Sequence, residues 1–174
     1  MGNKKLRPYT SLHTLKLVYY SLAHPHLQYC ISTWGGACKT TLQQLLTKQK
    51  IIIRCMLYQS YRAPSSPLFH KLSILKVDDV YKLSIAKLII KLFNNHTIPQ
   101  TLSTISNIHS HNTRHNIPSN LFIPTVTSNL GKTSFSHCGP TIWNNIPIEI
   151  RTSSIFSFKS KLKKHTIENY LTNT

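Results

Sequence analysis

Acidic residues are almost missing from this chain. Its 174 residues include four of them, namely Asp78, Asp79, Glu149 and Glu168. Catalytic sites for divalent metal ions rely on carboxylate ligands, so the shortage argues against nearly all divalent-metal catalysis. The 21 Lys and Arg residues give a formal net charge of +17 at pH 7. A polyanion is therefore the expected partner, because each phosphate neutralised by Lys or Arg releases condensed counterions.

Paired cysteines are also lacking. The chain has four cysteines, Cys30, Cys38, Cys55 and Cys138, and no Cys-x-x-Cys motif. Zinc fingers and disulfide scaffolds depend on regularly spaced cysteines, so neither class is expected. We expect buried or half-buried thiols instead, with no metal ion and no other cofactor.

Long apolar runs are a third absence. No stretch approaches the roughly 18 uninterrupted apolar residues of a membrane span, and residues 1–8 lack the apolar core of a secretory signal. Hydrophobic residues still make up 40% of the chain and occur along its whole length, which indicates a folded core. We therefore expect a soluble, intracellular protein that makes no membrane contact.

The first 95 residues show apolar side chains at helical spacing. The pattern predicts helices over residues 11–22, 25–34, 41–56, 68–72 and 77–94. Asp78 and Asp79 fall in the first turn of the helix over 77–94, where negative charge complements the helix dipole. Residues 1–95 are therefore predicted to form one helical domain.

The composition changes after this domain. Residues 96–119 are rich in Asn, Ser, Thr, His and Pro, which is typical of an exposed polar connector. Residues 121–126 and 132–135 then read as two short strands around Asn129-Leu130-Gly131, with Pro124 placing the first strand at a sheet edge. We predict a short β-hairpin here.

The chain ends with a turn of helix over 140–145 and a basic helix over 157–170. The predicted fold class is thus mainly α, with a helical domain followed by a small α+β part over 120–174 that contains the short hairpin.

Two arrangements suggest catalytic chemistry. The pair Asp78-Asp79 resembles the metal-binding carboxylates of polymerases, but such a site needs a third carboxylate from a separate strand, and the chain has no other Asp. A charge pair at a helix N-terminus accounts for it better. The ten histidines, including His109, His111 and His115, lie in a segment that favours a loop over a zinc site. A metal-free ribonuclease that uses two His and a Lys stays open as an alternative, although nothing selects the pair.

Basic residues are the stronger signal. No acidic residue precedes Asp78, whereas ordinary solvated surfaces intersperse both signs of charge. Tyr19, Tyr20, Tyr58 and Tyr61 could stack on bases, although tyrosines at helical spacing are more often core or boundary residues. The candidate nucleic-acid-binding residues are Lys48, Lys50, Arg54, Arg62, Arg114, Lys159, Lys161, Lys163 and Lys164.

Several short segments occur in a distinctive order. They are Leu17-Val18-Tyr19-Tyr20-Ser21-Leu22, Trp34-Gly35, Gln49-Lys50, Pro67-Leu68-Phe69, Thr113-Arg114 and Gly139-Pro140-Thr141-Ile142-Trp143-Asn144-Asn145-Ile146-Pro147. In order and spacing they resemble the region after the catalytic palm in reverse transcriptases of non-LTR (LINE-type) retrotransposons of the jockey and CR1-like group. The resemblance extends from about Leu12 to Leu171, and its most specific part is the Trp-Asn-x-x-Pro segment.

This resemblance implies a helical thumb-like domain, which grips the template-primer duplex, followed by the C-terminal tail of the family. The family's palm, with its aromatic-x-Asp-Asp motif, is expected upstream of Met1, so no catalytic residue can be transferred to this chain. We therefore expect a non-catalytic fragment of an RNA-directed DNA polymerase that binds RNA, DNA or an RNA/DNA hybrid. Upstream reverse transcriptase domains are further expected partners if the same element expresses them. An independent basic nucleic-acid-binding protein is the alternative.

Overall fold

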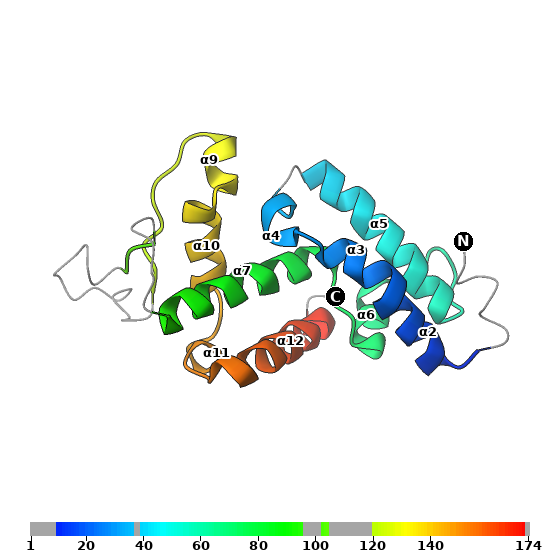
Figure 1. Ribbon diagram of the computed structural model, residues 1–174. Helices are drawn as coiled ribbons and strands as arrows, with labels where there is room; N and C mark the ends of the chain where they lie inside the picture. Colours follow the sequence, from blue (N-terminus) through cyan, green and yellow to red (C-terminus); the bar gives the residue numbers. More distant parts are fainter. Residues whose placement is uncertain (1–9, 37–38, 96–101, 105–119, 173–174) are drawn as a thin grey trace. The chain divides into compact units, whose positions relative to one another are not determined.

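The computed structural model describes residues 10–36, 39–95, 102–104 and 120–172, and over these ranges it is mainly helical (Figure 1). This confirms the mainly α part of the predicted fold class. The elements are α2 (Leu12–Val18), the π-helix η2 (Tyr19–Ala23), α3 (His24–Gln28), α4 (Ile31–Trp34), α5 (Lys39–Met56), α6 (Ser66–Leu72), α7 (Val77–Asn94), α9 (Asn129–Thr133), α10 (Phe135–Asn144), α11 (Ile148–Arg151) and α12 (Ile155–Thr172). Within the described ranges, no helix combines the length and the apolar character needed to cross a membrane.

The contacts group the chain into two compact units. Unit 1 comprises residues 1–81 and 163–174, and unit 2 comprises residues 82–162. This grouping differs from the linear order expected from the sequence, because α7 and α12 each contribute residues to both units. The connector predicted over 96–119 lies outside the described residues except for 102–104.

The first described helix of unit 1 changes its hydrogen-bond pattern. After α2, the N–H of His24 bonds to the carbonyl of Tyr19, five residues back, so the chain passes through the π-helix before α3. Pro25 follows in the first turn of α3, and it has no N–H to continue the normal ladder. Cys30 then adopts φ 48°, in the left-handed region, and separates α3 from α4. The single helix predicted over 25–34 is therefore two short helices.

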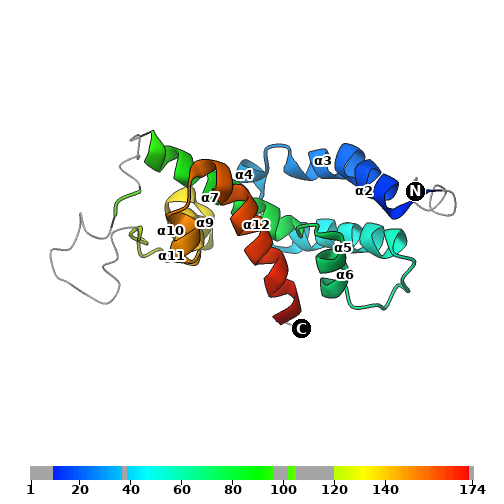
Figure 2. The same ribbon diagram turned by 90° about the horizontal axis from the view of Figure 1, so that it is seen from below.

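Helix α5 is the amphipathic helix predicted from about residue 41, and it lies alongside α2 and α6 (Figures 1 and 2). Its apolar stripe enters the interior of unit 1, as expected for a helix with one buried face. The buried apolar side chains of unit 1 are Leu15, Tyr19, Ile31, Leu46, Ile53, Met56, Phe69, Leu72, Ile74, Leu75, Val77, Val80, Ile167 and Tyr170.

A polar side chain, Gln49, lies within this interior with an exposed fraction of 2%. Its Nε2 donates to the Tyr19 hydroxyl at 2.9 Å and to the Leu75 carbonyl at 2.8 Å. Its Oε1 accepts from the Val77 N–H at 3.0 Å. One amide therefore bonds to three polar groups, one on η2 and two on the segment that enters α7, and a buried polar side chain is tolerated when it is bonded in this way.

Helix α7 has the bounds that the sequence predicted, from Val77 to Asn94. Asp78 and Asp79 lie in its first turn, which confirms their interpretation as a charge pair at a helix N-terminus. The terminal helix is also present, although it begins two residues earlier than the predicted start at Ser157.

The predicted β-hairpin is not present. Leu121 forms an isolated antiparallel bridge with Thr104, and no strand occurs among the described residues. The second predicted strand is helical instead, because Ser128 caps α9 by accepting from the Gly131 N–H at 3.1 Å. A side chain at Gly131 would overlap Val126, so this glycine permits the close approach of the capped turn.

An aromatic cluster lies within unit 2. The Trp143 ring, on α10, lies 5.4 Å from the ring of Phe93 on α7 and 6.0 Å from the ring of Phe158 on α12, measured between centroids. Such ring pairs contribute beyond the area they bury. The buried apolar side chains of unit 2 are Ile85, Ala86, Ile89, Ile90, Leu102, Leu121, Trp143, Ile146, Ile150, Phe158 and Leu162.

Candidate nucleic-acid interface

The three basic residues predicted on α5 do not share one side of the helix. Lys50 and Arg54 are four residues apart and lie on the same side, whereas Lys48 is about 200° from Lys50 around the axis. Lys48 is exposed, and the other two are half-buried. The structure therefore brings Lys50 and Arg54 together and leaves Lys48 at the opposite edge of the solvent-facing side.

Arg54 has a structural contact that the sequence did not reveal. Its Nε and Nη2 donate to the Ala63 carbonyl at 3.0 and 2.9 Å, and its guanidinium carbon lies 5.8 Å from the centre of the Tyr61 ring. A guanidinium that donates from two nitrogens fixes geometry more firmly than an ammonium group would. Arg54 therefore holds the loop between α5 and α6 in place, in addition to carrying charge.

The same loop presents Arg62, which is exposed, and two of the tyrosines considered as stacking residues. Tyr58 is 61% exposed and Tyr61 is 73% exposed, whereas Tyr19 is 1% exposed and belongs to the core. Burial raises the pKa of Tyr19 to about 12, although the hydrogen bond with Gln49 opposes the shift. The structure thus separates the two tyrosines that can contact a ligand from one that cannot.

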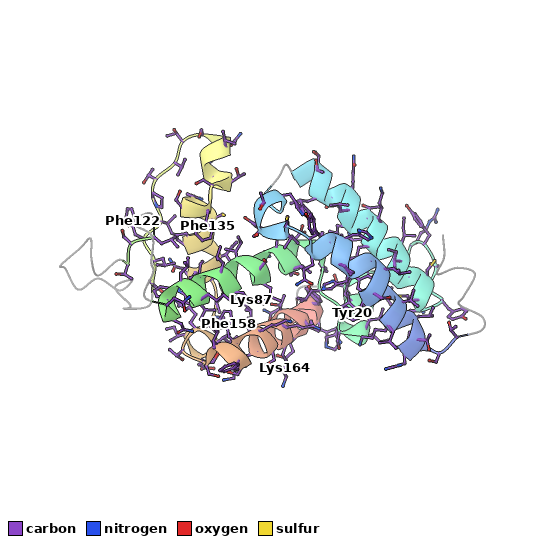
Figure 3. All side chains as sticks on the ribbon, in the orientation of Figure 1. Tyr20, Lys87, Phe122, Phe135, Phe158 and Lys164 are labelled. Carbon is purple, nitrogen blue, oxygen red and sulfur yellow. The ribbon has the colours of Figure 1, made fainter. Side chains whose placement is uncertain are left out.

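The lysines of α12 differ in their surroundings. Lys159, Lys161 and Lys164 are exposed, and Figure 3 labels Lys164 on this helix. Lys164 lies 4.0 Å from Glu168, and both side chains are largely exposed, so the pair adds little stability. The Lys163 ammonium group lies 5.7 Å from the centre of the Tyr20 ring, a contact within unit 1.

A basic cluster in unit 2 was missed by the sequence analysis. Burial, and then the charges of Lys159 and Lys91, lower the pKa of Lys87 on α7 (Figure 3). Lys87 and Lys91 are four residues apart, so the helical register alone could have paired them. Lys159 belongs to α12, and its proximity depends on the tertiary structure.

The segment from Trp143 to Pro147 stabilises unit 2. Trp143 is buried, and the Asn144 side chain makes two hydrogen bonds to the backbone of Leu121: its Oδ1 accepts from the N–H at 3.0 Å and its Nδ2 donates to the C=O at 2.8 Å. Pro147 precedes the first residue of α11. Nearby, buried Arg151 donates to Asn120 Oδ1 at 2.7 Å, and burial lowers the pKa of Arg151. These residues build the unit and leave ligand binding to other side chains.

Some of the residues singled out in the sequence lie outside the described residues, namely Arg114, Cys38, His109, His111 and His115. Elsewhere, Cys55 and Cys138 are half-buried as predicted, but Cys30 is exposed at the break between α3 and α4. In the described part of the chain, no three His, Cys, Asp or Glu residues gather in a way that could hold a metal ion.

The arrangement of basic and aromatic side chains is thus the basis for a functional proposal. Comparison of the chain with protein-family models, with curated proteins and with solved structures gives no match.

Proposed function

We propose that this chain binds RNA, DNA or an RNA/DNA hybrid without sequence preference, through exposed basic residues on its helices and on the loop between α5 and α6. The observation that carries the proposal is the acid-free stretch from α5 to α6, which contains six Lys or Arg residues and no Asp or Glu. Lys48 and Arg62 are exposed within it. Exposed cations without neighbouring acids attract phosphates and release counterions when they bind.

The positions of the acidic residues support the same proposal. Asp78 and Asp79 lie half-buried in the first turn of α7, and Tyr170 donates to Asp79. Glu168 lies beside Lys164, and Glu149 is in the first turn of α11. Three of the four acids thus complement helix termini or hydroxyl groups, and none of the four belongs to α5 or α6.

A salt titration tests the proposal directly. The affinity for a fluorescently labelled RNA/DNA hybrid, measured by anisotropy, should fall steeply with salt concentration. The double variant Lys48→Glu, Arg62→Glu should bind more weakly and lower the salt slope by about two, which is one for each lost phosphate contact. A flat salt response of the unmodified protein would contradict the proposal.

The matched control is Lys82→Glu with Lys132→Glu, which changes net charge equally at two exposed lysines outside the stretch from α5 to α6. It should lower affinity less and keep the salt slope. Equal losses in the two double variants would mean that net charge alone attracts the nucleic acid, without a defined face. RNA cleavage in EDTA that disappears on His→Ala substitution would favour the ribonuclease alternative instead.

The resemblance noted above leads to a more specific proposal: the chain is the thumb and tail part of a non-LTR retrotransposon reverse transcriptase. Its mainly helical structure is compatible with a thumb that grips a template-primer duplex. On this proposal the chain alone has no polymerase activity, because the palm carboxylates are absent from its sequence. Magnesium-dependent primer extension by the purified chain would contradict it. A continuing reading frame upstream of Met1 that encodes an aromatic-x-Asp-Asp motif would support it.

A further inference from the structure

The loop between α5 and α6 exposes two aromatic side chains beside a cation. Tyr58 and Tyr61 are 61% and 73% exposed, and Arg62 is exposed next to them. Large aromatic residues contribute most to binding when they are accessible and rigidly held. The loop therefore has the composition of a contact surface, and its conformation decides whether the rings are held in place.

Tyr58 occupies a position that normally belongs to glycine. The Gln59 N–H bonds to the Arg54 carbonyl at 3.0 Å, and the Tyr58 N–H bonds to the Cys55 carbonyl at 3.4 Å. This is the Schellman pattern that ends a helix, and its left-handed residue is usually glycine. Tyr58 has φ 58°, a conformation that a bulky side chain rarely adopts. The side chain is mostly exposed, so this strained position presents most of the Tyr58 ring to solvent, where a ligand can reach it.

The rest of the loop is fixed by hydrogen bonds. Arg54 donates from two nitrogens to the Ala63 carbonyl, and the Ala63 N–H donates to the Ser60 carbonyl at 3.1 Å. The Arg54 guanidinium also lies over the Tyr61 ring. Chain geometry limits the Cα atoms of Tyr58 and Tyr61 to about 11 Å apart, which is within reach of neighbouring nucleotides. Little ordering cost is then left for ligand binding.

We propose that Tyr58, Tyr61 and Arg62 form a stacking platform for the unpaired nucleotides of a single strand. The two rings stack on bases, and Arg62 pairs with a phosphate between or beside them. Bases in a duplex already stack on each other, so an aromatic platform selects unpaired ones and tolerates any sequence. This inference rests on the proposed nucleic-acid binding and names the part of the nucleic acid that the loop recognises.

Four variants test the platform against two probes, a labelled single-stranded oligothymidylate and a duplex with the same number of phosphates. Tyr58→Gly and Tyr61→Leu should each weaken single-strand binding by about five- to a hundredfold and leave duplex binding unchanged. Tyr61→Phe keeps the ring and should bind normally. Tyr29→Leu removes a tyrosine that is 77% exposed outside the loop, and it serves as the matched control.

Tyr58→Gly separates binding from folding. Glycine adopts the left-handed conformation freely, so this variant should be at least as stable as the original protein in urea denaturation. A stable Tyr58→Gly protein that binds the single strand as tightly as before would overturn the platform, while steep salt dependence with the duplex would leave the proposed function standing. Failure of the unmodified protein to bind either probe would overturn both. Equal losses with both probes would overturn the preference for unpaired nucleotides.

Discussion

The hydroxyl of Tyr170, near the end of α12, donates a 2.6 Å hydrogen bond to Oδ2 of Asp79 in the first turn of α7. The same hydroxyl accepts from the Lys76 N–H at 3.1 Å, and the Lys76 ammonium group lies 4.3 Å from the centre of the ring. Because Tyr170 and Asp79 are 91 positions apart, the bond ties the end of the described chain to the start of α7 within unit 1.

Removing this hydroxyl should destabilise unit 1. Tyr170→Phe should lower the free energy of unfolding by about 2 kcal/mol, because hydrogen bonds to charged groups contribute about 1.5–3 kcal/mol. Urea denaturation measures the change. Tyr29→Phe, at an exposed tyrosine, is the control and should have no effect. Equal stability of the two variants would show that the Tyr170 bond contributes nothing.

The buried tyrosines predict a loss of stability in alkaline solution. Burial, and for Tyr170 also the Asp79 carboxylate, raise the folded-state pKa of Tyr19 and Tyr170 above the value of about 10 expected in the unfolded chain. Since the unfolded state then releases its phenolic protons first, their contribution is complete below about pH 10 and is lost as the pH rises. For Tyr19 the loss ends near its folded pKa of about 12.

Urea denaturation over this pH range measures the effect. The double variant Tyr19→Phe, Tyr170→Phe should show a shallower alkaline decline than the unmodified protein, because only the contribution of Tyr20, whose pKa burial also raises, is common to both. An identical slope in the two proteins would contradict the assignment to these tyrosines.

Gln49 should be indispensable to unit 1. Gln49→Leu keeps the volume and the helix but leaves the Leu75 carbonyl and the Val77 N–H without their partner. The expected loss is about 3 kcal/mol, because each buried polar group left unpaired costs about 1–3 kcal/mol. The comparison is Gln44→Leu, at an exposed position of the same helix, which should be close to neutral. Comparable stability of the two variants, measured by thermal unfolding, would refute the prediction.

Asn144 should stabilise unit 2 through the Leu121 backbone. Asn144→Ala removes both hydrogen bonds to a residue that is 0% exposed, and the expected loss is about 2 kcal/mol. The neighbouring Asn145 is exposed, so Asn145→Ala provides a control with the same chemical change. Hydrogen exchange of the Leu121 amide is the sharpest measurement, because protection should fall in the first variant alone.

Charge repulsion around Lys87 should be relieved by neutralising it. Lys87→Gln removes a half-buried charge that desolvation disfavours most and that Lys159 and Lys91 disfavour further, so the protein should become more stable, especially at low ionic strength. The gain should shrink as salt screens the remaining charges. Lys132→Gln, at an exposed lysine of unit 2, should show no comparable gain. A Lys87→Gln protein that is less stable in low salt would count against the cluster.

Helices were predicted correctly from the sequence where the local signals agreed. Helix α7 was predicted with its observed bounds, because its apolar periodicity continues to Asn94 and its two aspartates mark the first turn. The hairpin prediction failed because β propensity in residues 121–126 competes with tertiary contacts. The Asn144 side chain bonds both backbone groups of Leu121, and this pairing comes from a helix more than twenty positions away.

Some features of the candidate interface likewise followed from the sequence, and others depended on tertiary contacts. Charge and its imbalance are properties of composition, so the sequence alone indicated a polyanion partner and named the basic residues. Their surroundings depend on which segments meet: Arg54 is bound to Ala63, Lys163 lies over Tyr20, and Lys87 lies near Lys159. Helical register links only residues three or four positions apart, and all three of these contacts join more distant positions.

The sequence by itself therefore determined the helical class, the start of α7 and the excess of positive charge, because each depends on local periodicity or on composition. The tertiary structure alone decided which tyrosines are exposed, which cations are held in fixed contacts and where the last helix attaches. These features depend on hydrogen bonds and burial between segments far apart in the chain, and no local pattern encodes them.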